Sequence, residues 1–571
     1  MKRFLPLLLL LPLLFFAACK KVPDHAKYIP KNAITVVGIN LKALSNKMLW
    51  SKLTGSSAMS GLDSAFTDMG TNINAKSLEK SGVNTSSTIY AYASSTPVDP
   101  MMGTSSTPGM IAIIPLENAT DWEAFVKKMD GTTTIQKAGE NMSATSKEVT
   151  ALWTKDVAFV TNNAKSPGQY VALPDGSEEW QEGAPDAAKA MTTLQQAMAV
   201  TKDGSLIQDS RFIDLEKEGN DVSIWVNYEE MMSKMGAAMA MGAQLMKETA
   251  IASGLNFEKG ELDGTMRYYV SPAMKEATSM MGDGTLPSEM MDKMPKQNLA
   301  GFMAMSLSTK GIKSILDKTG MLGVANMGLA SQGLTLDDIF DAFTGDITMS
   351  FANVAVVEKT SGEGEYAYTS NDPRADFVVA MKLGKKEAVA KLMAFFTKRE
   401  LLTQMSPGVY TVPGSDGIGA IAMNETYAVA CNTVAQAQAW LAGKGNGTLP
   451  DDAKGLTNDG PFSMYANGQV LMAGFSPMAK SDKEKAMMDA SKKMFQSFAL
   501  SGGKFSGGAV NYTGKMMLVN KEENALVQLA NYFSRMKAID KMPNPEVEMP
   551  MMEETMPMDD TAIMVPPSAS L

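Results

Sequence analysis

The sequence predicts an α+β protein made of two tandem, similar units, each a mainly antiparallel sheet covered by helices, followed by a disordered tail. Short apolar runs of strand length alternate with helix patterns, and frequent strand–turn–strand signals favour antiparallel pairing over a doubly wound parallel sheet. The same kinds of segment recur in the same order in both halves. The 571 residues, 45% hydrophobic and 20% charged, exceed one ordinary domain and suffice for a globular core.

Residues 1–18 have the pattern of a signal peptide. Lys2 and Arg3 form a positive start, and the stretch Phe4–Ala18 is uncharged and rich in leucine. A helix needs about 20 apolar residues to cross a bilayer. This stretch is shorter, and Pro6 and Pro12 interrupt it.

Cys19 is predicted to be the lipid attachment site. The small residues Ala17 and Ala18 lead directly into Cys19, which resembles the lipobox of bacterial lipoproteins, although Phe16 stands where leucine is more usual. In such proteins the cysteine becomes the first mature residue and carries the acyl chains that anchor it. Residues 19–28 would then be a lipidated tether. A plain signal peptide with a chance cysteine is the alternative.

Two units follow, predicted at 29–290 and 291–535. Pro30 and Pro295 mark the start of similar segments, and four further pairs occur in the same order, which indicates a tandem duplication. The paired segments are 28–49 with 293–316, 108–129 with 373–396, 155–162 with 425–432, 222–227 with 462–467, and 253–270 with 501–520. A change of offset predicts an insertion around 163–205 in the first unit, read as an exposed loop followed by a helix.

Residues 536–571 are predicted to be a disordered tail rich in methionine, proline and acids. Prolines exclude a long helix there, and no periodic apolar face is present. Thioethers suit Cu(I), so a Cu(I)-binding tail is one alternative. Its candidate ligands are Met549, Met551, Met552, Met556 and Met558. Because the chain has 49 methionines throughout, a general compositional bias is the preferred explanation, and no metal or cofactor is predicted.

The segment AKYIPKNAITVVGINLKALSNKMLW, directly behind the lipobox, resembles a family of uncharacterised envelope lipoproteins of Bacteroidota-type bacteria, catalogued as a domain of unknown function. The most specific part of the pattern is Pro23–x–x–Ala26–x–Tyr28–x–Pro30. The resemblance implies a lipid-anchored protein of the cell envelope and brings no catalytic residues. Lys20 and Lys21 stand where surface-displayed members carry acids, which favours the outer membrane and a periplasmic orientation.

Sequence motifs do not point to a catalytic mechanism. Serine–lysine, phosphate-loop and calcium-loop patterns are absent, and the single histidine, His25, is expected to be solvated on the tether. Cys431 is expected to be a buried structural thiol, since with Cys19 lipidated it has no disulfide partner. A net charge of −10 argues against nucleic acid as a partner.

The predicted function is therefore a non-catalytic binding or structural role at the membrane, with an envelope protein, a glycan or a lipid as partner. The alternative is a hydrolase that uses paired carboxylates in a site between the two units. The 62 acidic residues allow many such pairs, and the sequence singles out none of them. Enzymatic activity is therefore left open, and a binding role is favoured over it.

Overall fold

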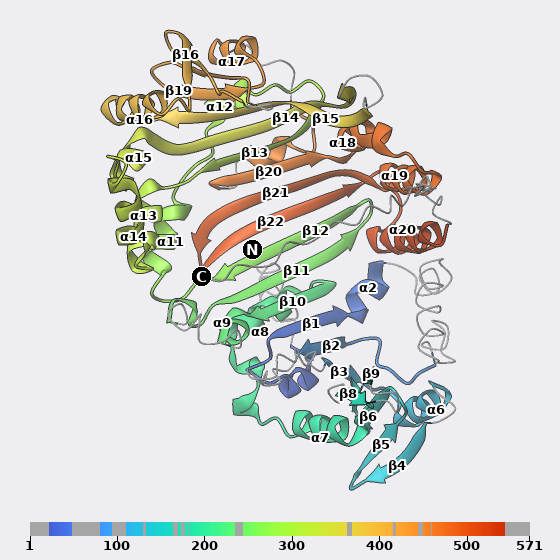
Figure 1. The fold of residues 1–571 in the computed structure, drawn as a ribbon. Helices are drawn as coiled ribbons and strands as arrows, with labels where there is room; N and C mark the ends of the chain where they lie inside the picture. Colours follow the sequence, from blue (N-terminus) through green and yellow to red (C-terminus); the bar gives the residue numbers. More distant parts are fainter. Residues whose placement is uncertain are drawn as a thin grey trace, which may run out of the picture.

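The computed structural model describes residues 22–47, 80–93, 110–129, 133–163, 169–172, 177–181, 183–233, 244–361, 368–414, 418–443, 449–457 and 460–542. These residues form one large antiparallel sheet of twenty strands, a separate two-stranded hairpin and the helices around them (Figure 1). The α+β prediction is confirmed. Among the described helices, none combines the length and apolarity that crossing a bilayer requires.

The first half supplies ten strands to the large sheet. They are β1 (Thr35–Asn40), β2 (Thr88–Ala93), β3 (Met110–Pro115), β4 (Thr134–Ala138), β5 (Asn141–Thr145), β6 (Val149–Trp153), β7 (Val157–Asn162), β10 (Val222–Asn227), β11 (Ala250–Glu258) and β12 (Glu261–Tyr269). The helices are η2 (Asp24–Tyr28), α2 (Leu41–Lys47), α6 (Ala119–Met129), α7 (Ala187–Met198), η3 (Lys202–Gly204), η4 (Leu206–Gln208), α8 (Ser210–Glu218), α9 (Tyr228–Ser233), η6 (Gln244–Met246), α11 (Lys275–Gly282) and α12 (Ser288–Lys293).

The second half supplies the other ten strands. They are β13 (Leu299–Ser306), β14 (Phe343–Ser361), β15 (Tyr368–Leu383), β16 (Thr403–Ser406), β17 (Val409–Thr411), β18 (Ala420–Met423), β19 (Tyr427–Cys431), β20 (Phe462–Asn467), β21 (Phe495–Ser506) and β22 (Ala509–Leu518). The helices are α13 (Thr309–Lys318), α14 (Met321–Ala330), α15 (Leu336–Ala342), α16 (Lys386–Lys398), α17 (Val434–Leu441), η8 (Lys454–Thr457), α18 (Gly468–Phe475), η9 (Ser476–Met478), α19 (Asp482–Met494) and α20 (Ala525–Asp540).

The two sets of strands meet where β12 pairs with β22, from Glu261 opposite Met517 to Tyr269 opposite Ala509. From this junction the first half continues outward as β12, β11, β10, β1, β2, β3, β7, β6, β5, β4. The second continues as β22, β21, β20, β13, β14, β15, β19, β18, β17, β16. Numbered by chain order within each half, both runs follow the same sequence of strands.

The two faces of the sheet are packed differently. On the face that we call the covered face, Tyr90 and Trp225 lie in a buried cluster with Ala26 of η2, Leu194 of α7 and Phe212 of α8. In the second half, Phe302 and Tyr465 pack with Met291 of α12 and Leu456 of η8 on the same face. On the opposite face, here the open face, α6 packs on the outer strands β5, β6 and β7. Over the other strands, the helices of this face lie mainly at the two strand ends. Helices α2, α18, α19 and α20 gather at one end, and α11, α13 and α14 at the other (Figure 1).

The structure changes three details of the predicted organisation. The expected tether is wrong for residues 24–28, because these form η2 and the side chain of Ala26 is fully buried. The expected tail begins too early, since α20 extends to Asp540 and buries Ile539. The predicted loop of the insertion contains the hairpin of β8 (Gln169–Ala172) and β9 (Glu178–Gln181) before the expected helix, α7. The predicted signal peptide, residues 1–18, and residues 543–571 lie outside the described residues.

Candidate functional site

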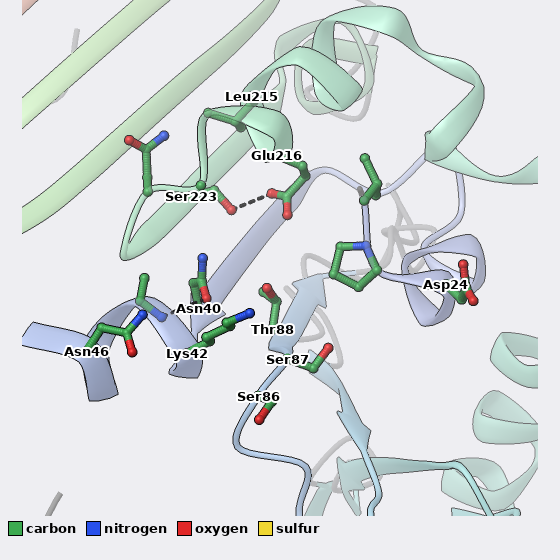
Figure 2. A pocket seen from close by; sticks show the side chains of 15 residues that line it. Asp24, Asn40, Lys42, Asn46, Ser86, Ser87, Thr88, Leu215, Glu216 and Ser223 are labelled. Atoms are coloured by element: carbon green, nitrogen blue, oxygen red, sulfur yellow. Dashed lines mark hydrogen bonds between the residues drawn. The ribbon is translucent and has the colours of Figure 1, made fainter. Parts of the chain in front are cut away.

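A polar cavity of about 550 Å³ lies in the first half, between η2, the start of α2, the loop before β2, and α8 (Figure 2). Its wall combines three kinds of hydrogen-bonding group. Amides come from Asn40, Asn46 and Asn220, hydroxyls from Ser86, Ser87, Thr88 and Ser223, and charges from Asp24, Lys42 and Glu216. Ligand sites typically combine a concave shape with a few convergent polar groups, and this cavity has both.

Local sequence signals place these groups. Asn40 ends β1, and its side-chain oxygen accepts a hydrogen bond of 3.0 Å from the amide of Ala43 in the first turn of α2. Asp209 caps the start of α8 in the same way, and Gly219 ends it in the left-handed conformation with φ of 67°. These two caps define the ends of α8. Glu216 lies in its last turn, and its side chain points to the cavity.

The carboxylate of Glu216 is the most constrained group of the cavity. The hydroxyl of Tyr90 donates to its Oε2 and the hydroxyl of Ser223 donates to its Oε1, each at 2.5 Å. Figure 2 shows the second of these bonds. Burial raises the pKa of Glu216, while both hydroxyl donors act to lower it. Each carboxylate oxygen has two acceptor sites, so Glu216 keeps acceptor capacity for a ligand while its orientation is held.

His25 lies behind this cavity, and the prediction that it is solvated is wrong. Its Nε2 is 2.6 Å from the carbonyl oxygen of Thr88, and its ring centre is 5.4 Å from that of Tyr90. Burial lowers the pKa of His25, against the raising effects of the Thr88 carbonyl and Asp24. The only histidine of the chain thus supports the tyrosine that supports Glu216.

A second polar cavity, of about 420 Å³, occupies a related position in the second half. It lies beside α12 and is lined by Ser306, Thr344, Asp346, Lys382 and Tyr427, among others. Asn40 pairs with Thr88 across β1 and β2, and Ser306 pairs with Asp346 across β13 and β14. Here too a carboxylate receives two hydroxyl donors: Ser306 at 2.6 Å and Thr344 at 3.0 Å from the oxygens of Asp346.

A third cavity, of about 610 Å³, lies where the halves meet, between the turn at Gly507–Gly508 and first-half residues. Acidic residues line it, including Glu229, Glu230 and Glu248. Its one arginine, Arg211, is held by Asp209 at 2.7 Å and lies 5.4 and 5.3 Å from the ring centres of Trp225 and Tyr269.

The other predicted residues separate into two groups. Cys431 is fully buried in β19, as expected, and burial raises the pKa of its thiol to about 12. Cys19 and the candidate copper ligands lie outside the described residues and stay predictions. Within the described part of the chain, no three His, Cys, Asp or Glu side chains cluster as metal ligands would.

Sequence reasoning missed Glu216, Tyr90 and Ser223. Strand pairing brings Tyr90 and Ser223 together, since Gly38 of β1 lies opposite both, and α8 adds Glu216 to them. Only Ser223 carries a local signal, a hydroxyl among the apolar residues of its strand, and that signal is common.

Comparison with known proteins identifies the family. A family model described as a domain of unknown function, DUF4836, matches residues 25–391. The chain belongs to the DUF4836 family. The family match runs from η2 into α16, so it includes Tyr90, Glu216 and Ser223. This confirms the resemblance to a domain of unknown function. No curated protein matches the DUF4836 chain in a sequence search.

Solved structures of TP0453 also match, with low similarity. Crystal form III has 9% identity and a TM-score of 0.25, over 46% of this chain and 88% of that one. Crystal form IV has 9% identity and a TM-score of 0.24, over 46% and 87%. Crystal form I has 10% identity and a TM-score of 0.24, over 44% and 81%. Similarity at this level carries no conclusion about fold or function.

Proposed function

We propose that this chain is a non-catalytic binding protein of the cell envelope, anchored through a lipid on Cys19 to the outer membrane and facing the periplasm, which binds a hydroxyl-rich ligand such as a glycan. The observation that carries the proposal is the first-half cavity, where Glu216 is held by two hydroxyl donors among amide and hydroxyl groups. Preorganised polar groups lower the entropic cost of binding.

The chemistry of the wall suits a glycan. A sugar presents many hydroxyls, each able to donate and accept. Glu216 and Asp24 supply acceptors, Lys42 supplies donors, and the side-chain amides of Asn40 and Asn46 supply both. A cavity of about 550 Å³ falls within the usual range for small-molecule sites, roughly 300–1,000 Å³.

The same proposal includes a tandem duplication, with units near 29–290 and 291–535. Two observations support it: the identical strand order on either side of the β12–β22 junction, and the polar cavities beside η2 and α12. The second cavity would then be a related site with altered specificity, since Asp346 replaces Thr88 in the matching strand pair.

The cavity is tested by thermal shift with soluble cell-wall glycan fragments. We expect the native chain to gain stability from a binding fragment, and Glu216→Gln and Lys42→Ala to lose that gain. Lys217→Ala is the matched control, because Lys217 is the exposed neighbour of Glu216 on α8. Turnover of a fragment that Glu216→Gln abolishes would contradict the non-catalytic proposal, and equal shifts in all variants would contradict the site.

The anchor is tested separately. A Cys19→Ala chain should appear in the soluble envelope fraction and should not incorporate radiolabelled palmitate. The native chain should stay in the membrane fraction and should incorporate the label. Retention of Cys19→Ala in the membrane, with no labelling of the native chain, would contradict lipid anchoring while leaving the cavity proposal intact.

The hydrolase alternative is supported by the cavity at the junction, whose lining includes several carboxylates beside the bases Lys31, Arg211 and Lys275. The amide of Glu248 donates to Glu229 at 2.7 Å, and Glu230 lines the same space. Paired carboxylates in one cavity are what glycosidic hydrolysis requires. Glycan cleavage lost in Glu229→Gln and retained in Glu216→Gln would favour this alternative over binding.

A further inference from the structure

The open face of the sheet carries almost no polar side chain. Opposed residues of neighbouring strands point to the same face, so the pairings define rows that cross the sheet. One row on the open face crosses twelve neighbouring strands without a polar side chain. Its members are Ala430, Val379, Met349, Met303, Met464, Leu500, Gly514, Gly264, Leu255, Val222, Ile39 and Ile89.

The neighbouring row has the same character. Its members are Met381, Ile347, Met305, Phe462, Gly502, Tyr512, Met266, Ser253, Ile224, Val37, Ala91 and Ala112. Only Tyr512 and Ser253 contribute hydroxyls, and the row contains no charge. We call these two rows the apolar floor.

The apolar floor is accessible. The large side chains of both rows are partly exposed, and Ile39 is 38% exposed, whereas the alternate residues of β1, β2, β10 and β20 on the covered face are buried. At one end of the strands, Leu44 of α2 and Val527 of α20 pack on Phe257 of β11. Helices α2 and α20 thus contribute to one border of the floor.

The two central strands, β12 and β22, carry polar side chains on the covered face and apolar side chains on the open face. On the covered side of β12 and β22, Lys515 pairs with Glu261 at 3.5 Å and with Asp263 at 3.2 Å, and Thr265 and Thr513 are exposed. On the open side of the same strands lie Leu262, Met266, Tyr512 and Met516. Strict alternation of this kind is typical of strands with one face in water and the other against an apolar layer.

We propose that the apolar floor binds the acyl chains of a membrane phospholipid. An uncharged floor with few hydrogen-bonding groups is complementary to hydrocarbon, which needs neither. Met266, Met303, Met349 and Met464 supply flexible, polarizable side chains that adapt to chains of irregular shape. A protein partner would instead need a matching apolar face of its own, since polar groups placed opposite the floor would find almost nothing to pair with.

The proposed lipid anchor at Cys19 indicates where the phospholipid would come from. In this respect the inference rests on the proposed function. The described fold begins at Val22, three residues after Cys19. Three extended residues reach about 11 Å at most, so an acylated Cys19 would hold Val22, which packs against the covered-face cluster, within about that distance of the bilayer. The anchor would thereby keep the whole protein at a membrane that supplies phospholipid. The ligand of the floor differs from the polar ligand of the first-half cavity.

The test uses the full chain with Cys19→Ala, so that binding is measured without the anchor. The probe is dipalmitoyl phosphatidylglycerol in competition with the fluorescent fatty acid cis-parinaric acid. We expect saturable binding of the probe, displaced by the phospholipid. Met266→Lys and Met303→Lys should weaken it by about tenfold or more, because each places a charge where hydrocarbon would lie.

Thr265→Lys is the matched control, since it adds the same charge to the same strand on the covered face, at a position where Thr265 is exposed to water. It should bind like the Cys19→Ala chain, and circular dichroism should show all variants folded. Absence of saturable binding, or equal weakening by Thr265→Lys, would overturn the inference. So would a dimer that Met266→Lys dissociates without any bound phospholipid, because a second copy would then cover the floor. Palmitate labelling of the native chain at Cys19 is a separate measurement. A failure of phospholipid binding is therefore distinguishable from a failure of the proposed anchor.

Discussion

At the scale of single residues, the predictable ones are those whose environment follows from their own strand. Cys431 stands in the apolar run YAVAC, and the structure buries it completely. Glu216 stands in the charged run DLEKE of an exposed-looking helix, and only the approach of Tyr90 and Ser223 distinguishes it from Glu218. Ser223 is close to Glu216 in the sequence, but Tyr90 lies 126 residues away, and no local pattern encodes its approach.

His25 gives a prediction for pH dependence. Its folded-state pKa is lowered by burial, so below its unfolded value of about 6.5 the unfolded chain binds more protons than the folded one. The native protein should therefore lose stability as the pH falls through 6.5 and down to the folded pKa. His25→Gln lacks this contribution, so its melting temperature relative to the native chain should rise as the pH goes from 7.5 to 5. Parallel curves for the two proteins would show that His25 titrates as it does in the unfolded chain.

At the scale of elements, the sequence patterns located strands and helices better than they located ends. Each of the five paired segments contains the expected strands, as in β10 and β20, which both lead into a helix. The short helix η2 was missed because its five residues, DHAKY, include two charges and one histidine and resemble a solvated linker. Only tertiary packing distinguishes it from a linker. Ala26 and Ile29 are fully buried, and the ring centre of Tyr28 lies 5.1 Å from that of Phe159.

Removal of residues 20–28 tests whether η2 is part of the fold. A tether can be removed without loss of stability, whereas η2 covers the cluster that contains Tyr90 and Phe159. We expect the deletion to lower the free energy of unfolding by about 2–5 kcal/mol, the usual cost of uncovering large buried side chains. Denaturant titration measures it, and removal of Lys20 and Lys21 alone is the control that should change nothing. Identical midpoints for both deletions would restore the tether prediction.

At the scale of the whole molecule, the sequence indicated two similar units and left their packing open. Two sheets side by side and two sheets across a cleft were both compatible with the paired segments. The structure joins the strands of the two halves of the chain edge to edge through β12 and β22, where Gly264 lies opposite Gly514. Such pairing is specified by backbone hydrogen bonds and by the shape of the edges, and hydrophobic alternation in one strand carries no information on which strand lies beside it.

The junction makes a prediction about the first half alone. A chain of residues 20–290 keeps its own clusters around Trp225 and Trp153, so it should fold, but it leaves β12 as a nine-residue edge strand. Long, unpaired edges with an apolar side invite pairing with another chain. We expect this fragment to form dimers or larger species in size-exclusion chromatography with light scattering, by pairing β12 with β12 in place of β22. Leu262→Lys, which puts a charge on the apolar side of that edge, should shift the fragment toward monomer, whereas Thr265→Lys on the hydrated side should not. A fragment that stays monomeric at all concentrations would mean that β12 is not held as a strand without β22, and that the two halves fold as a single unit.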